Sequence, residues 1–322
     1  MVILYLRHDD SFESHPLKNL QEPIDSKSIF WIDIFQPNAE EIERIEILFD
    51  IKLPTKHDRE EIELSSRYWE DNRCIKINSY FFVSFFFVES TKSHYNESVS
   101  FVLQDNILFT VRDSELQTFE MMRAMLLTHP KELFSGYDIF IQIFDIRIDK
   151  DADLLEYASK ESDEIRKKLL WEHGSHSVEV LRKISTLQEF TLKIRQSVFD
   201  KRRILTAMAK SPKLPPTIKE DLSIMMKDIN SLIEFIAIDD NTLDNLQNLF
   251  LAQTSIEQNK IIKLFTVASV ALMPPTLIAS IYGMNFHFIP ELKWTLGYPF
   301  ALILMGLSSA IPLIYFRKKK WL

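Results

Sequence analysis

The sequence predicts an α+β domain followed by a very long helix and a hairpin of two membrane-spanning helices. Three observations predict this class. Runs typical of β-strands dominate the chain before Gly136. The stretch between Pro216 and Pro274 contains neither glycine nor proline, and two long runs near the end contain no charged residue. Because nothing interrupts the middle stretch, one helix is expected to continue from outside the membrane into it.

Residues 1–135 are expected to form the domain with a mixed sheet. Asn38 and Glu41 form a capping box ahead of an apolar face, so a helix is expected over 39–49. The Phe-rich stretch 80–87 is too short to cross a bilayer and is interpreted as a buried strand. Gln104-Asp105-Asn106 is typical of a hairpin turn. Strands are expected at 2–6, 29–34, 74–88, 98–103 and 107–112.

Residues 136–216 are expected to form a helical hairpin. Apolar residues recur at helical spacing after Gly136, and a second helix is expected over about 176–209. The stretch 211–216 contains three prolines and ends this region.

The helix expected over 217–282 carries a heptad-like apolar seam. At 1.5 Å per residue this helix would be roughly 100 Å long, which is too long to bury its seam in one small domain. We therefore expect the seam to pack against copies of the same chain. Its residues are Leu222, Met225, Ile229, Leu232, Ile236, Leu243, Leu246 and Leu249.

The uncharged runs 264–282 and 294–316 are each long enough to cross roughly 30 Å of hydrocarbon. We expect a first span at about 262–282, an outer loop at 283–293 and a second span at 294–316. A basic tail, 317–322, follows directly, and the positive-inside rule places it in the cytoplasm together with the body. The sequence therefore predicts a multi-pass protein of the inner (plasma) membrane with both termini cytoplasmic.

Composition excludes several classes of function. The segment 263–322 contributes +5 to the formal charge of −8, which leaves −13 on the segment 1–262 and argues against a nucleic-acid partner. The five glycines cannot form GxGxxG, a P-loop or GxSxG, and no HExxH occurs, so no enzyme is expected. The single cysteine, Cys74, excludes an internal disulfide framework.

A polar stripe follows the first expected span. It carries nearly all the polar side chains of that span and no charge, at alternating spacings of three and four positions. In a ring of parallel helices it would line a wet pore, and its neutral oxygens could accept hydrogen bonds from the water that Mg²⁺ holds tightly. Alternatively, small polar residues let helices pack closely. The stripe consists of Asn259, Ile262, Thr266, Ser269, Met273, Thr276, Ser280 and Gly283.

The loop between the spans contains Tyr282-Gly283-Met284-Asn285 followed by Pro290-Glu291-Leu292. These residues, together with the stretches 256–260, 273–276, 60–63 and 67–71, resemble the CorA family of magnesium, cobalt and nickel transporters. The resemblance implies a funnel-shaped homopentamer with a cytoplasmic α/β domain, a stalk helix that continues as the pore-lining span, and an outer ring of second spans. It also implies influx of hydrated Mg²⁺, and of Co²⁺ and Ni²⁺, gated by intracellular Mg²⁺ bound between subunits.

The resemblance further implies roles for individual residues. The selectivity filter would be Gly283, Met284 and Asn285. Glu291 and His287 would lie at the outer entrance, and a basic collar would consist of Arg317, Lys318, Lys319 and Lys320. The pore-lining positions would be Asn259, Ile262, Phe265, Thr266, Ser269, Met273, Thr276 and Ser280, with Ile262 and Phe265 at a hydrophobic constriction.

Two departures from the family pattern keep alternatives open. His287 stands where many members have Glu, and Ile289 stands where Met is usual. An imidazole at the entrance suits softer metals, so a zinc-preferring transporter of the same superfamily is one alternative. A membrane-anchored metal sensor without transport is another.

Regulatory metal sites are expected between neighbouring subunits. Candidates are Glu70 and Asp71 on the domain, which would face Asp239, Asp240 or Asp244 on a neighbour's stalk. Mg²⁺ binding would relieve repulsion among these carboxylates and hold the subunits together. Alternatively, they form a solvated acidic face.

Overall fold

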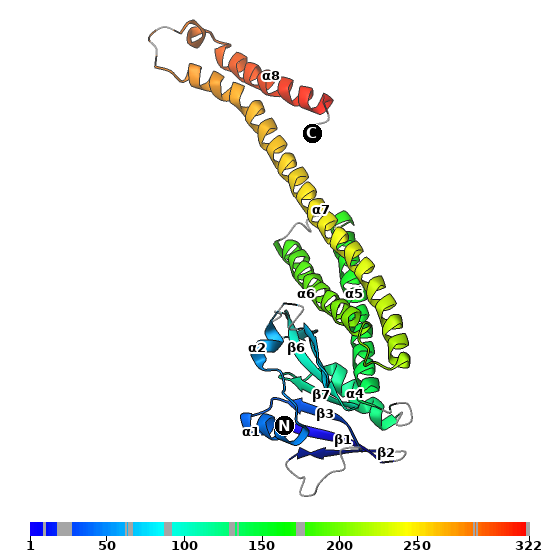
Figure 1. Ribbon diagram of the computed structural model, residues 1–322. Helices are drawn as coiled ribbons and strands as arrows, with labels where there is room; N and C mark the ends of the chain where they lie inside the picture. Colours follow the sequence, from blue (N-terminus) through cyan, green and yellow to red (C-terminus); the bar gives the residue numbers. More distant parts are fainter. Residues whose placement is uncertain are drawn as a thin grey trace. The chain divides into compact units, whose positions relative to one another are not determined.

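The computed structural model describes residues 1–8, 11–17, 28–61, 63, 67–86, 92–128, 133, 135–171, 178–285, 287 and 289–319. The chain divides into two compact units. The first comprises Met1–Trp171 and Val178–Leu246, and the second includes Gln247–Leu322. Helix α7 (Pro216–Tyr282) contributes residues to both (Figure 1).

Among the described residues, seven strands form one mixed sheet in the first unit. Their order is β2-β1-β3-β7-β6-β5-β4, with β3 and β7 parallel. All five expected strands are present, which confirms the mixed sheet, and β5 and β6 pair along their whole length. The strands are β1 (Val2–His8), β2 (Ser11–Pro16), β3 (Ile29–Phe35), β4 (Tyr68–Glu70), β5 (Cys74–Phe86), β6 (Lys92–Gln104) and β7 (Ile107–Arg112).

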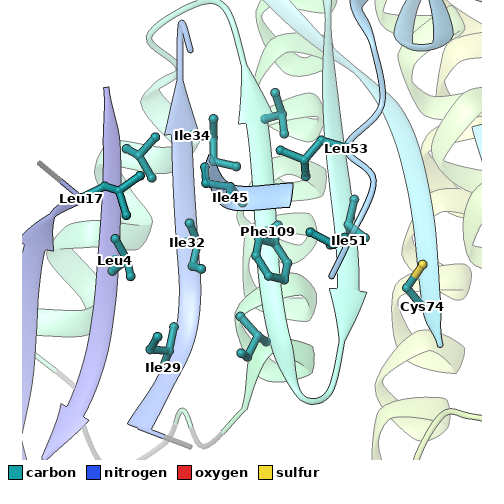
Figure 2. Packing of buried hydrophobic residues seen from close by; sticks show 14 of the residues in the cluster. Leu4, Leu17, Ile29, Ile32, Ile34, Ile45, Ile51, Leu53, Cys74 and Phe109 are labelled. Atoms are coloured by element: carbon teal, nitrogen blue, oxygen red, sulfur yellow. The ribbon is translucent and has the colours of Figure 1, made fainter. Parts of the chain in front are cut away.

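The two faces of this sheet are covered by different helices. Helix α1 (Ala39–Phe49) begins at the expected capping box and places Ile45 against Ile32 and Phe109 (Figure 2). Because successive strand residues point to opposite faces, the other face presents aromatic rings such as Phe81 and Phe101. These pack against the rings of Phe144 and its neighbours on α5.

Four further helices belong to this unit: α2 (Lys56–Glu60), α4 (Gln117–Thr128), α5 (Gly136–Trp171) and α6 (Val178–Met208). One buried ion pair joins two strands, and another joins two helices. Arg112 on β7 lies 2.9 Å from Asp33 on β3, and Lys201 on α6 lies 3.1 Å from Asp151 on α5. Burial lowers the pKa of Lys201, and the Asp151 carboxylate opposes that effect. Breaking such a pair leaves an uncompensated buried charge, so these contacts fix the helices in place.

Over 222–246 the apolar seam of α7 is buried within its own chain, except for the half-buried Leu232, so the expectation that it packs on copies is wrong there. Leu222 and Ile229 are 0% exposed and Leu243 is 1% exposed. Helix α6 supplies part of the covering surface: Arg195 pairs with Asp240 at 2.9 Å, and the Thr206 hydroxyl lies 3.8 Å from the Met226 sulfur. A heptad pattern requires an apolar partner but does not say which chain provides it.

The second unit contains the end of α7, the 3₁₀ helix η3 (Pro290–Lys293) and α8 (Gly297–Lys318). Among the described helices, α7 and α8 contain stretches long and apolar enough to cross a membrane, each with mean hydropathy 1.8. Only 11% and 6% of these stretches are buried in the chain. The core helix of a soluble protein is mostly buried, so the exposure of these two stretches fits two membrane spans.

Candidate functional site

The polar stripe of α7 is largely uncovered in the single chain. Ile262 is 61% exposed and Met273 is 68% exposed, and Phe265, next to the stripe, is 68% exposed. The hydroxyls of Thr266 and Thr276 donate to the carbonyls four positions earlier, at 2.8 and 2.7 Å. Their oxygens therefore keep acceptor capacity for water. Thr266 is half-buried, and the remaining members, Asn259, Ser269, Thr276, Ser280 and Gly283, are exposed.

Helix α8 packs on a different face of α7. The buried residues there are Val267 and Ala271, at 4% and 6% exposure, and Ala301 on α8 is 7% exposed. Val267 follows the stripe residue Thr266 by one position, which is a rotation of about 100° around the helix. Close packing of α8 therefore does not explain the stripe.

Two consecutive prolines interrupt the hydrogen bonding of α7 within the apolar stretch. Pro275 has no N–H, so the carbonyl of Ala271 loses its partner one helical turn later. Ser309 on α8 donates its hydroxyl to that carbonyl at 2.8 Å. Because an unpaired carbonyl in hydrocarbon is costly, this bond fixes α8 against α7 at the proline pair.

Ser309→Ala should therefore destabilise the hairpin by about 1–2 kcal/mol, because it leaves the Ala271 carbonyl unpaired. Thermal unfolding in detergent measures the change. Ser308→Ala is the matched control, since the Ser308 hydroxyl bonds to Met305 within its own helix. Equal melting temperatures for the two variants would contradict the assignment.

The residues of the expected filter lie where α7 ends. The N–H of Gly283 still donates to Ala279 at 2.9 Å, and the N–H of Met284 donates to Ile281 at 3.2 Å. Met284 is 49% exposed, and Asn285 and His287 are also exposed. The Asn285 side chain has no hydrogen-bond partner among the described residues, so its amide is available to a ligand.

Glu291 belongs to η3, which packs closely against the start of α8. A Cβ on Gly297 would lie 2.2 Å from the carbonyl oxygen of Glu291, and the N–H of Gly297 donates to Trp294 at 3.0 Å. Only glycine permits this approach of two backbones. Gly297 therefore sets the position of the exposed Glu291.

Gly297→Ala should force the outer loop apart and cost about 2 kcal/mol or more. Gly306→Ala is the control, because a Cβ on Gly306 meets nothing within 4 Å. Melting temperature in detergent is the measurement. A Gly297 variant as stable as the Gly306 variant would show that η3 moves freely.

The two domain carboxylates predicted to bind metal are engaged locally. Glu70 accepts hydrogen bonds from the Tyr68 hydroxyl at 2.7 Å and from Ser211 at 2.9 Å. The N–H of Cys74 donates to the Asp71 carboxylate at 2.8 Å, and that of Arg73 does so at 2.7 Å; these bonds lower the pKa of Asp71. The Asp71 carboxylate therefore stabilises the turn before β5. Glu70 instead joins β4 to Ser211, which follows α6.

The stalk carboxylates differ from one another. Asp240 pairs with Arg195, and Asp244 is exposed. Asp239 is 3% exposed, and its Oδ2 has no hydrogen-bond partner within the described chain. Burial, together with the neighbouring Asp240 charge, raises the pKa of Asp239 to about 6.

A further group of acids was not singled out from the sequence. Burial raises the pKa of Asp145 on α5, and the charges of Asp149, Asp228 and Asp221 raise it further, so the Asp145 carboxyl experiences repulsion from acids on α5 and α7. The spacing of Asp145 and Asp149, one turn apart, was the available signal. Across the described ranges, no three His, Cys, Asp or Glu residues of one chain are placed to hold a metal ion.

The basic residues after the second span lie at the end of α8. Arg317 and Lys318 occupy its last turn and Lys319 is its C-cap, where cations are favourable next to the helix dipole. Lys320 lies outside the described residues.

A family model and the sequences of known proteins both match this chain and point to the same family. A family model described as "CorA-like Mg2+ transporter protein" matches residues 26–318. The magnesium transport protein CorA of Wolinella succinogenes is 45% identical over 322 residues, covering 100% of both chains. That of Escherichia coli K12 is 33% identical and covers 96% of this chain and 94% of its own.

Solved structures share the fold at low sequence identity. The complete CorA magnesium transporter of Methanocaldococcus jannaschii matches with TM-score 0.82 at 20% identity, over 100% of this chain and 99% of that one. The cytoplasmic domain of ZntB from Vibrio parahaemolyticus matches with TM-score 0.60 at 11% identity, over 79% of this chain and 97% of that one. The expected architecture of mixed-sheet domain, long helix and apolar hairpin is thus confirmed.

Proposed function

The chain belongs to the CorA family of Mg²⁺ transporter proteins, and from this premise we propose that it conducts hydrated Mg²⁺ along the polar stripe of α7. The observation that carries the proposal is that α8 packs on another face of α7 and leaves the stripe open. A single stripe cannot enclose water. Several copies of α7 around a common axis would do so, and we propose the homopentamer that the family resemblance implies.

In this assembly Asn285, next to Gly283 and Met284, forms the outer ring that selects the ion. Mg²⁺ gives up water reluctantly, so the exposed amide oxygens act on its hydration shell rather than on the bare ion. The exposed Glu291 raises the local concentration of cations at the entrance. Below the ring, the uncharged oxygens of Thr276 and Thr266 accept hydrogen bonds from the same water and allow release.

Ile262 and Phe265 form the proposed closed constriction, since a ring of large apolar side chains excludes water from a narrow bore. Asn259 lies at the cytoplasmic mouth. The body and the basic tail lie in the cytoplasm, as the positive-inside rule indicates. We propose that the membrane is the inner (plasma) membrane.

Gating by intracellular Mg²⁺ requires carboxylates whose repulsion an ion can relieve. The acids around Asp145 fit this role better than Glu70 and Asp71, because the latter are used in local hydrogen bonds. We therefore propose that Asp145, Asp149, Asp221 and Asp228 of one subunit meet a neighbour across a Mg²⁺ site. Binding there favours the closed assembly, and loss of Mg²⁺ lets the stalks separate.

The test is Mg²⁺ influx into liposomes that contain the purified chain and an internal Mg²⁺ indicator, with an inside-negative potential. Influx well above that of empty liposomes is expected. It should decrease when millimolar Mg²⁺ is present on the side of the body. No influx under either condition would refute the channel and favour a metal sensor without transport.

Transport of Co²⁺ and Ni²⁺ is proposed as well, and zinc preference is the competing assignment. His287 is exposed at the outer loop, where an imidazole could bind a softer ion. Adding Zn²⁺, Co²⁺ or Ni²⁺ against Mg²⁺ in the same liposomes ranks the ions. If Zn²⁺ is transported in preference to Mg²⁺ by the parent chain but not by His287→Glu, the zinc assignment replaces the magnesium one.

A further inference from the structure

A polar cavity of about 420 Å³ lies in the first unit, where β6 extends beyond the end of β7. Strand β7 pairs with β6 only over Ser100–Gln104, so the part of β6 at 96–98 has no partner on that side among the described strands. Helix α2 lies beside this part, because the Ser98 hydroxyl donates to the Arg59 carbonyl at 2.5 Å (Figure 1). The volume suits a small molecule, and the polar lining favours a charged one.

Arg59 supplies a hydrogen-bond donor that nothing in the described chain uses. The residue is 5% exposed, and its Nη2 donates to the Asp113 carboxylate at 2.7 Å. Its Nη1 is buried and has no hydrogen-bond partner among the described residues. Because a buried guanidinium nitrogen without an acceptor is costly, a bound group that accepts hydrogen bonds would stabilise this side of the cavity.

Asn96 on β6 supplies an acceptor in the same situation. Its Nδ2 donates to the carbonyl of Lys193 on α6 at 3.0 Å, which fixes the orientation of the amide. The Oδ1 atom is buried and has no hydrogen-bond partner in the described part of the chain. Two residues that line one cavity therefore each lack a partner, and the missing partners are of opposite kinds: an acceptor for Arg59 and a donor for Asn96.

The charged residues of the lining carry both signs. Lys56 and Arg59 on α2 are cations. Glu97 on β6 and Asp113 after β7 are carboxylates, so the formal charges cancel. Burial raises the pKa of Glu97 and the Asp113 charge raises it further, although the Ser114 hydroxyl and the two cations oppose this effect. An ammonium group would favour the ionised form of Glu97, whereas a simple anion would meet both carboxylates.

We propose that this cavity binds a small zwitterion, such as a free α-amino acid. Its carboxylate accepts a hydrogen bond from Arg59 Nη1 and is attracted by Lys56. Its ammonium group donates to Asn96 Oδ1 and faces Glu97. A ligand held in this way connects α2 to β6 and, through Asn96, to α6. The proposal goes beyond transport and does not depend on which ion the chain carries.

Thermal unfolding of the full-length chain in detergent tests the proposal with four zwitterions of increasing size: glycine, L-serine, L-glutamine and L-phenylalanine. At least one should raise the melting temperature saturably through the millimolar range, because a ligand that binds only the folded chain stabilises it. Propionate and propylammonium each carry one of the two charged groups and should give no saturable rise. If none of the four zwitterions acts, water fills the cavity and the proposal is overturned. Propionate that acts as strongly as the zwitterions also overturns it and assigns an anion site.

Two variants test whether binding occurs in this cavity. Arg59→Lys keeps a positive charge beside Asp113 and removes the unpaired nitrogen. Lys56→Glu changes an exposed residue, so this variant should fold even if Arg59→Lys does not. Each should move the midpoint of the titration to a concentration higher by about threefold or more.

Lys52→Glu is the matched control, since Lys52 is exposed and does not line the cavity. It should leave the midpoint unchanged. A midpoint that Lys56→Glu does not move, or that Lys52→Glu moves equally, overturns the assignment to this cavity. Mg²⁺ influx in liposomes reports on the proposed function separately, so either conclusion can fail alone.

Discussion

Asn285→Ala is expected to lower Mg²⁺ influx at least tenfold in liposomes without changing how the chain folds. The amide is exposed at the end of α7 and has no hydrogen-bond partner among the described residues, so its removal leaves no buried group unsatisfied. In a ring of copies, the same change would remove every amide that orients the hydration shell. A tenfold loss of influx corresponds to an increase of about 1.4 kcal/mol in the barrier to transport. The loss of several hydrogen bonds to the hydrated ion is enough to account for it.

Asn245→Ala provides the matched control. Asn245 is exposed on the same helix and outside the apolar stretch, so the same substitution there should leave influx unchanged. Melting temperatures of both variants in detergent should equal that of the parent chain. Normal influx through Asn285→Ala would remove Asn285 from the selectivity filter, even if the chain remains a transporter.

Elements with a strong local signal could be predicted from the sequence. Asn38 and Glu41 mark the start of α1 because the two reciprocal hydrogen bonds of a capping box depend on adjacent residues alone. The two spans follow from uncharged length. Edge strands β2 and β4 were missed because one is polar and the other is very short. Helix α4 was also missed, although its buried Phe119, Met122 and Leu126 recur at helical spacing.

Features that depend on which distant residues pack against a side chain could not be predicted from the sequence. The spacing of the polar stripe was visible in the sequence, but which face α8 covers was not. The close approach of Gly297 to Glu291 joins residues on two elements, and no local pattern marks it. Glu70 was selected for its charge, yet its partner Ser211 lies 141 positions away. Asp239 is buried and Asp244 is exposed, and this difference also depends on how α7 packs in the folded chain.

The buried Asp239 predicts a pH dependence of stability. Its pKa is raised from 3.8 to about 6 in the folded chain, chiefly by burial. Between these values the folded chain binds the proton more strongly than the unfolded chain, so the free energy of unfolding falls as pH rises from about 4 to about 6. The shift corresponds to about 3 kcal/mol, with little further change above pH 6.

Asp239→Asn should remove this contribution, because the amide stays neutral at every pH. The variant should unfold at a higher temperature than the parent chain at pH 7.5, and the difference should shrink as pH falls toward 4.5. Asp244→Asn removes a carboxylate from the exposed face of the same helix and should keep the parent's pH profile. If the melting temperatures of the parent and of Asp239→Asn differ by the same amount at every pH, the Asp239 carboxyl is ionised in the folded stalk. In that case a bound cation at Asp239 becomes the better explanation, and adding Mg²⁺ at pH 7.5 should stabilise the parent and leave Asp239→Asn unchanged.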